Sequence, residues 1–214
     1  MASSTTLDSR ARDVRAGIDP NSIGDMPTLF RTPLAALALV ALLASTAACA
    51  ETRVILMRGW FGVFSTGIDA MAETLRAQGV QAEAIGHLAW RAAARRIAQE
   101  RAQGKPGKVV LVGHSQGGNN TVDIARELKA VSIPVDLIVT LAPWKQDPVP
   151  ANVLKAVNYY QAGGWGSPLV GEADFKGELV NLDIGPEPGI THVNIDKSPR
   201  VQAEVVRAIV ALVR

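Results

Sequence analysis

Two hydrophobic patterns alternate along residues 53–213. Short, nearly continuous apolar runs are typical of strands that are buried on both faces, and they occupy residues 53–57, 108–112 and 135–141. Weaker runs predict further strands at residues 80–85, 156–160 and 177–184. Apolar residues at helical spacing predict helices at residues 66–77, 88–103, 117–130 and 199–213. This alternation predicts an α/β fold, a three-layer α/β/α sandwich around a mostly parallel sheet.

The first 50 residues follow neither pattern. Residues 1–25 are polar, and Met26 then opens a segment with a lone Arg31 and an uncharged run from 32 to 50 that ends in Ala48-Cys49-Ala50. A basic start, an apolar middle and a small-residue cleavage site form the layout of a secretory signal. We therefore expect translation to start at Met26, cleavage to fall before Glu51, and residues 51–214 to form a single exported domain, periplasmic or secreted.

Two other interpretations of this leader stay open. Cys49 stands where a lipoprotein signal places its acylated residue, which would associate the protein with a membrane. The uncharged run of 19 residues is also just long enough to span about 30 Å of hydrocarbon as an anchor.

Composition narrows the function classes. A chain of 214 residues is long enough to bury a core without disulfides. The net charge of +2 gives no support for a nucleic-acid partner, which calls for a clustered basic face. The single cysteine excludes an internal disulfide and a cysteine-ligated structural zinc site. No metal or organic cofactor is expected.

The strongest motif is Gly113-His114-Ser115-Gln116-Gly117, which follows the predicted strand at 108–112 and precedes the helix at 117–130. G-x-S-x-G between a strand and a helix is typical of a nucleophile elbow. The serine must occupy a sharp, strained turn, and side chains at the flanking glycines would collide with the strand and the helix. We predict that Ser115 is a nucleophile.

A serine nucleophile needs a base, and the chain has three histidines. His192 lies after the last predicted strand, and the chain order of serine, acid and histidine favours it. His87 is the alternative, or else a loop residue near the pocket. His114 lies inside the elbow and is interpreted as structural.

The acid is less clearly marked. Asp147 follows the strand at 135–141, at the edge where ligands bind in open α/β sheets, and is the favoured acid. Asp174 and Asp183 are the alternatives. A solvated loop charge is the competing interpretation of Asp147.

Oxyanion donors should come from the residue after the nucleophile and from the loop after the first strand. We therefore expect the backbone N–H of Gln116 and that of Trp60 or Phe61 to serve. Trp144 and Trp165 lie in loops at the same edge, where they either line an acyl pocket or pack on the surface.

Three segments together resemble the small, lidless α/β-hydrolases of the lipase/esterase superfamily: GHSQGG at 113–118, RGWFGVFSTGID at 58–69 and THVNID at 191–196. The resemblance implies a minimal α/β-hydrolase fold with Ser115 as nucleophile and His192 as base. The chain departs from many relatives at Ala142, where an acid is expected. Either Asp147 substitutes for that acid, or the triad is reduced to a dyad.

These observations predict an exported serine hydrolase that cleaves carboxylic esters or thioesters through an acyl-enzyme on Ser115. Its substrate would be a small-molecule or lipid ester. Two alternatives remain: a non-catalytic binding protein on a hydrolase scaffold, and an acyltransferase that uses the same residues.

Overall fold

The computed structural model describes residues 52–164 and 166–214. The expectations for the start at Met26, the signal sequence, cleavage before Glu51 and acylation of Cys49 lie outside these residues, and so does Trp165. Within the part of the chain that is described, no helix is both long and apolar enough to cross a membrane.

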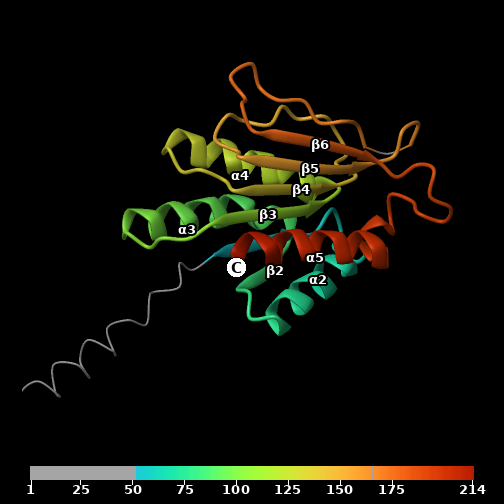
Figure 1. Ribbon diagram of the computed structural model, residues 1–214, viewed down its shortest axis with the longest axis horizontal. Helices are drawn as coiled ribbons and strands as arrows, with labels where there is room; N and C mark the ends of the chain where they lie inside the picture. Colours follow the sequence, from blue (N-terminus) through green and yellow to red (C-terminus); the bar gives the residue numbers. More distant parts are fainter. Residues whose placement is uncertain (1–51, 165) are drawn as a thin grey trace, which may run out of the picture. The chain divides into compact units, whose positions relative to one another are not determined.

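The centre of the fold is a six-stranded sheet in the order β2-β1-β3-β4-β5-β6 (Figure 1). Every neighbouring pair of strands is parallel. The strands are β1 (Arg53–Met57), β2 (Ala82–Ile85), β3 (Val109–His114), β4 (Leu137–Leu141), β5 (Lys155–Tyr160) and β6 (Glu178–Asp183). Each lies where the hydrophobic pattern predicted a strand.

Helices cover both faces of this sheet, α2 and α5 on one side and α3 and α4 on the other (Figure 1). Their bounds are α2 Thr66–Ala77, α3 Trp90–Ala102, α4 Gln116–Ala130 and α5 Pro199–Val213. Two short 3-10 helices, η1 (His87–Ala89) and η2 (Ile195–Lys197), precede α3 and α5. The predicted helix at 88–103 is therefore a 3-10 turn followed by an α-helix.

The core consists of two apolar layers, one on each side of the sheet. Along β1, Val54 and Leu56 join the layer under α2 and α5, whereas Ile55 and Met57 join the layer under α3 and α4. All four side chains are fully buried, and each such burial stabilises the fold by about 1.5–3 kcal/mol. Burial on both faces explains the continuous apolar strands and confirms the predicted three-layer class.

Because all six strands are parallel, their carboxyl ends meet at one edge, which we call the carboxyl edge. The loops that leave β1, β3, β4 and β6 lie there, and they carry Ser115, His192, Trp60, Phe61 and Trp144. This is the edge at which open α/β sheets bind ligands.

Candidate active site

Ser115 occupies a strained turn between β3 and α4. Its φ is 55° and its ψ is −123°, a region that residues with a side chain rarely adopt. Its amide donates to the carbonyl of Leu141 at 2.9 Å, which ties the turn to the end of β4. The hydroxyl consequently stands clear of the sheet at the carboxyl edge.

The two flanking glycines permit this turn. A Cβ on Gly113 would lie 2.2 Å from the carbonyl oxygen of Gly117, and a Cβ on Gly117 would lie 2.3 Å from the carbonyl oxygen of Met57. Both contacts are with backbone, which cannot move aside. The spacing of the motif therefore follows from the close approach of β1, β3 and α4.

His192 meets the serine from the loop between β6 and η2. Its Nε2 lies 3.0 Å from Ser115 Oγ. In this arrangement the hydroxyl donates to Nε2, and the neutral ring carries its own proton on Nδ1. Burial and, to a smaller extent, the neighbouring His114 together lower the pKa of His192 to about 4. The imidazole is therefore a neutral proton acceptor at neutral pH.

The expectation that Asp147 orients this imidazole is not met by its contacts. The carboxylate is 7% exposed, accepts from Asn119 Nδ2 at 2.8 Å, and lies 3.3 Å from Lys145 Nζ and 3.8 Å from Arg126 Nη1. Asn119 and Arg126 belong to α4, whereas η2, which follows His192, packs against α2 and α5. Asp147 thus anchors its own loop to α4.

The other two candidate acids also have partners elsewhere. Asp174 lies 3.1 Å from Lys129 Nζ. Asp183 accepts the amides of Ala162 and Gly185 at 3.0 and 2.8 Å, and these bonds lower its pKa. Among the residues described, the structure brings together Ser115 and His192, and it joins none of the three aspartates to them by a hydrogen bond or ion pair.

The loop at 58–65, which we call the Gly59 loop, lies directly against the nucleophile. A Cβ on Gly59 would come within 3.0 Å of Ser115 Cβ. The backbone hydrogen bonds within this loop use the amides of Gly62, Val63 and Ser65.

The expected oxyanion donors remain available at this place. In the described hydrogen-bond network the amides of Trp60, Phe61 and Gln116 have no acceptor. Their position beside Ser115 agrees with the expected role, which stays a prediction. His87 donates from Nδ1 to the Gly59 carbonyl at 3.2 Å, so the alternative base instead supports the loop.

Sequence reasoning missed two supporting residues. Ser65, the residue before α2, bonds to Gly59 and to His114. Gln161, directly after β5, donates to the carbonyl of Ile190 at 2.7 Å and so supports the segment that leads to His192. The position of Ser65 immediately before a predicted helix was a signal for a cap, but nothing local indicated its partners.

A cavity of about 300 Å³ opens over the serine, with apolar walls from Trp60, Phe61, Phe64 and Val193. Of the ten exposed large hydrophobic residues in the described ranges, seven lie in the loops and the short helix at the carboxyl edge. These seven, which we call the apolar rim, are Trp60, Phe61, Val63, Phe64, Leu88, Trp144 and Val193.

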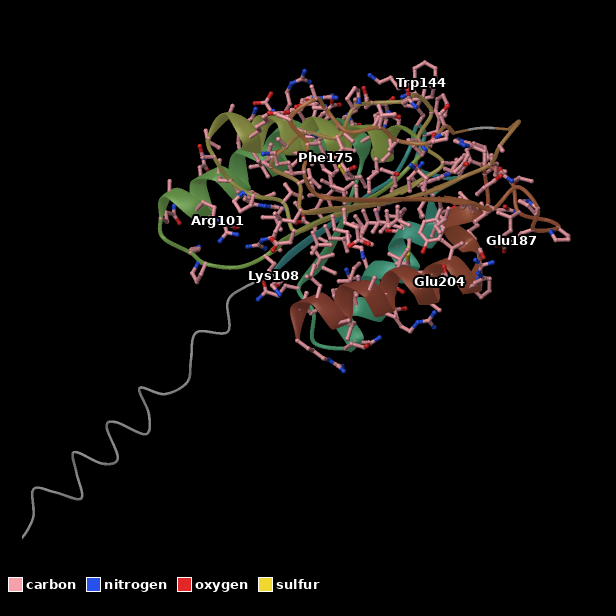
Figure 2. The ribbon with its side chains drawn as sticks, turned by 45° about the horizontal axis from the view of Figure 1, so that its top comes forward. Arg101, Lys108, Trp144, Phe175, Glu187 and Glu204 are labelled. Atoms are coloured by element: carbon pink, nitrogen blue, oxygen red, sulfur yellow. The ribbon has the colours of Figure 1, made fainter. Side chains whose placement is uncertain are left out.

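Trp144 belongs to the surface of this rim. Its ring centroid lies 5.3 Å from that of Trp60, with the two planes tilted by 45°. Figure 2 shows Trp144 projecting from the molecule, at the end opposite Arg101 and Lys108.

Within 52–164 and 166–214, no three His, Cys, Asp or Glu side chains are grouped so as to hold a metal ion.

Neither a family model nor a curated protein matches the sequence. A solved structure from Xanthomonas campestris pv. campestris, described as a candidate hydrolase of the alpha/beta superfamily, is similar to the chain at 21% identity. The match covers 73% of this chain and 99% of that one, with a TM-score of 0.39. The parallel sheet and the elbow after β3 themselves define the minimal α/β-hydrolase fold that the sequence resemblance implied.

Proposed function

We propose that the protein is a serine hydrolase that cleaves carboxylic esters through an acyl-enzyme. One observation carries this proposal: the 3.0 Å approach of His192 Nε2 to Ser115 Oγ, on a strained turn that faces an open cavity with apolar walls. A nucleophile within hydrogen-bond reach of a neutral base is the signature of covalent acyl transfer.

In acylation, Ser115 Oγ attacks the ester carbon while His192 Nε2 takes the hydroxyl proton. The carbonyl oxygen becomes an oxyanion, which the amides of Gln116 and of Trp60 or Phe61 stabilise. When the intermediate collapses, the C–O bond breaks, and the imidazolium returns its proton to the departing alcohol. The nearby oxyanion stabilises this imidazolium, which burial alone disfavours.

In deacylation, water replaces the alcohol. His192 takes a proton from water, the resulting hydroxide attacks the acyl carbon, and the second intermediate releases the acid and restores the serine hydroxyl. The same donors serve both intermediates, because both place an oxyanion at the same position.

The apolar rim favours esters with an apolar acyl chain. Each methylene transferred from water to such a surface contributes about 0.8 kcal/mol, or roughly a fourfold gain in affinity. Three rim residues, Phe61, Val63 and Leu88, are 83%, 67% and 85% exposed, so the apolar surface extends well outside the cavity. A chain too long for the cavity would continue along this surface.

Initial rates on p-nitrophenyl esters from acetate to laurate, with the full chain and its Ser115→Ala variant, test the proposal. We expect activity that increases with acyl length and falls by about 10⁴-fold or more in the variant. A fluorophosphonate probe should label the wild type and not Ser115→Ala. A wild-type protein that neither hydrolyses the esters nor reacts with the probe would contradict the proposal and favour a non-catalytic binding protein.

A further inference from the structure

Ser65 and His114 are two polar residues that line the cavity without taking part in the chemistry above. Ser65 is 1% exposed and His114 is 2% exposed. Burying a polar group costs free energy unless the group is hydrogen-bonded, so both residues need hydrogen-bond partners. Both are fully engaged: Ser65 Oγ lies 3.0 Å from the Gly59 amide and 2.8 Å from His114 Nδ1, and His114 Nε2 lies 2.7 Å from the His192 carbonyl oxygen.

The direction of each of these hydrogen bonds can be assigned. A carbonyl oxygen only accepts, so His114 Nε2 carries a proton and donates to His192. Burial lowers the pKa of His114, so the ring is neutral and its Nδ1 accepts. The Ser65 hydroxyl therefore donates to Nδ1, and its oxygen accepts from the Gly59 amide. The three hydrogen bonds therefore run in series from the Gly59 amide through Ser65 and His114 to the His192 carbonyl, and each donor has one acceptor.

We propose that Ser65 and His114 are positioning residues, which set the distance between the oxyanion donors of the Gly59 loop and the base His192. This inference rests on the function proposed above. These hydrogen bonds form a series. At one end Ser65 accepts from the amide of Gly59, the residue before Trp60, and at the other end His114 donates to the main-chain carbonyl of His192. A transition state that needs both an oxyanion donor and a base within a few tenths of an ångström depends on their separation.

A second contact joins the start of α2, which follows the Gly59 loop, to the segment after His192, and we expect it to keep the fold intact when the first contact is removed. Asp196 Oδ2 accepts from the Gly67 amide at 2.8 Å. A Cβ on Gly67 would lie 2.0 Å from the Asp196 carbonyl oxygen, so the segment after His192 is seated directly on the start of α2. Loss of Ser65 or His114 should therefore shift the site by a small distance without releasing this segment.

The test compares kcat and KM for p-nitrophenyl butyrate in Ser65→Ala, Ser65→Thr and His114→Gln. Ser65→Ala removes both bonds of the serine, and we expect kcat to fall about 10–100-fold with KM within about threefold. Ser65→Thr keeps the hydroxyl and should restore kcat to within about threefold of wild type. His114→Gln keeps a donor for the His192 carbonyl but no fixed acceptor for Ser65, so it should lose as much as Ser65→Ala.

Thr140→Val is the matched control. It removes a buried hydroxyl that donates to Asn158 at 2.8 Å and does not line the cavity, and it should lower thermal stability without lowering kcat. The double variant Ser65→Ala/His114→Gln should lose no more kcat than the worse single variant, because both residues act in one chain. This non-additivity, and rescue by threonine, would not arise from a general loss of stability.

Two results would overturn the inference: kcat within about twofold of wild type in Ser65→Ala or, should that variant not fold, in His114→Gln; or an equal loss of kcat in Thr140→Val. Either result leaves the proposed function standing if the wild type is active and Ser115→Ala is not. An inactive wild type that the fluorophosphonate probe does not label would instead remove both proposals together.

Discussion

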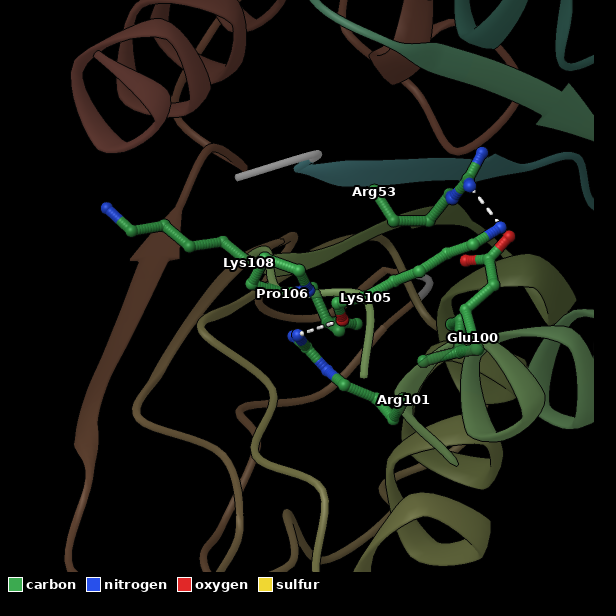
Figure 3. Close-up of a pocket in the computed structure, with 8 residues that line it drawn as sticks. Arg53, Glu100, Arg101, Lys105, Pro106 and Lys108 are labelled. Atoms are coloured by element: carbon green, nitrogen blue, oxygen red, sulfur yellow. Dashed lines mark hydrogen bonds and ion pairs between the residues drawn. The ribbon is translucent and has the colours of Figure 1, made fainter. Parts of the chain in front are cut away.

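At the amino end of the sheet a hollow of about 20 Å³ is lined by eight residues, four of them cations, whereas at the carboxyl edge a cavity of about 300 Å³ opens over a serine and a neutral histidine. Both lie at the ends of the same parallel strands. Figure 3 shows the amino-end hollow with the side chains of Arg53, Glu100, Arg101, Lys105 and Lys108.

Three of the cations at the amino end are engaged by acceptors of the protein itself. Arg53 lies 2.7 Å from Glu100, Arg101 donates to the carbonyls of Lys105 and Gly107, and Lys108 donates to the carbonyl of Leu212. Arg101 and Leu212 lie in the last turns of α3 and α5, where cations complement the helix dipole. The charged side chains at this end therefore stabilise the fold.

The carboxyl edge is arranged in the opposite way. Ser115 and His192 are paired with each other and open to the cavity, and the supporting bonds of Ser65 and His114 lie behind them. For the proposed function, the difference teaches that the reactive groups are the polar groups that the fold leaves open to a cavity. A search for clustered charge alone would have pointed to the amino end.

The largest effect is expected when one residue at each end of the sheet is replaced and the kcat values of the two variants are compared. His192→Ala removes the base, and we expect kcat for p-nitrophenyl butyrate to fall about 10⁴-fold or more. Arg101→Ala removes two bonds to loop carbonyls and should leave kcat within about twofold of wild type, with stability lowered by about 1 kcal/mol. A comparable loss of kcat in both variants would show that the two ends are coupled.

The apolar rim allows a smaller test within the same comparison. Val63→Ser/Leu88→Ser changes rim residues that do not line the cavity, and it should raise KM for the laurate ester about tenfold, a loss of about 1.4 kcal/mol of apolar contact. The acetate ester is too short to reach them, so its kinetics should not change.

Val131→Ser/Leu154→Ser is the matched control for the rim. These residues are 54% and 56% exposed but precede β4 and β5, at the amino end of the sheet. Neither ester should be affected by this pair. An equal rise in KM for laurate in both double variants would mean that overall surface hydrophobicity, and not the rim, governs the affinity for long chains.

Asp147 gives a test within the carboxyl edge. If its carboxylate oriented the imidazole, Asp147→Asn would lower kcat by about 10⁴-fold. Its contacts with Asn119, Lys145 and Arg126 predict a different result: kcat within about fivefold of wild type and a lower melting temperature. Kinetics and thermal melts of the one variant separate the two roles.

The sequence pattern predicted the helices and strands closely, because apolar spacing and helix caps are signals within a few neighbouring residues. The bounds of β1, α2 and α5 were predicted to the residue; α5 begins with Pro199 in its first turn after Ser198, whose side chain accepts from the Val201 amide. The 3-10 turn before α3 was missed because it runs directly into α3, and such a turn at the start of an α-helix leaves no separate mark in the apolar spacing.

The site was predictable only where chain order carries information. The order of serine and histidine indicated Ser115 and His192, which the fold brings within 3.0 Å. The hydrogen bond between Ser65 and His114 spans 49 positions and depends on the register of β1 against β3. Asp147 lies at the expected edge, but its orientation toward α4 is set by Asn119, whose role no local pattern showed.

The smallest predicted effect is on stability, and it concerns the contact between Asp196, in the segment after His192, and Gly67 in α2. Asp196 is fully buried, and burial raises the pKa of its carboxyl to about 6, against the opposing effect of the Gly67 amide. Between about pH 4 and pH 6, the folded protein therefore holds a proton that the unfolded chain has released. The stability from this group is complete below the unfolded pKa of about 4 and is lost as pH rises through about 6. Asp196→Asn keeps an acceptor for Gly67 and carries no charge.

We therefore expect Asp196→Asn to match the wild type near pH 4 and to exceed it near pH 8 by about 1 kcal/mol, or about 2–4 °C in melting temperature. The competing effect is the start of α2, whose dipole favours a carboxylate by about 0.3–1 kcal/mol. Complete burial makes the cost of the charge the larger of the two. Melting curves across this pH range decide between them, because a variant less stable than wild type near pH 8 would show that the helix dipole dominates.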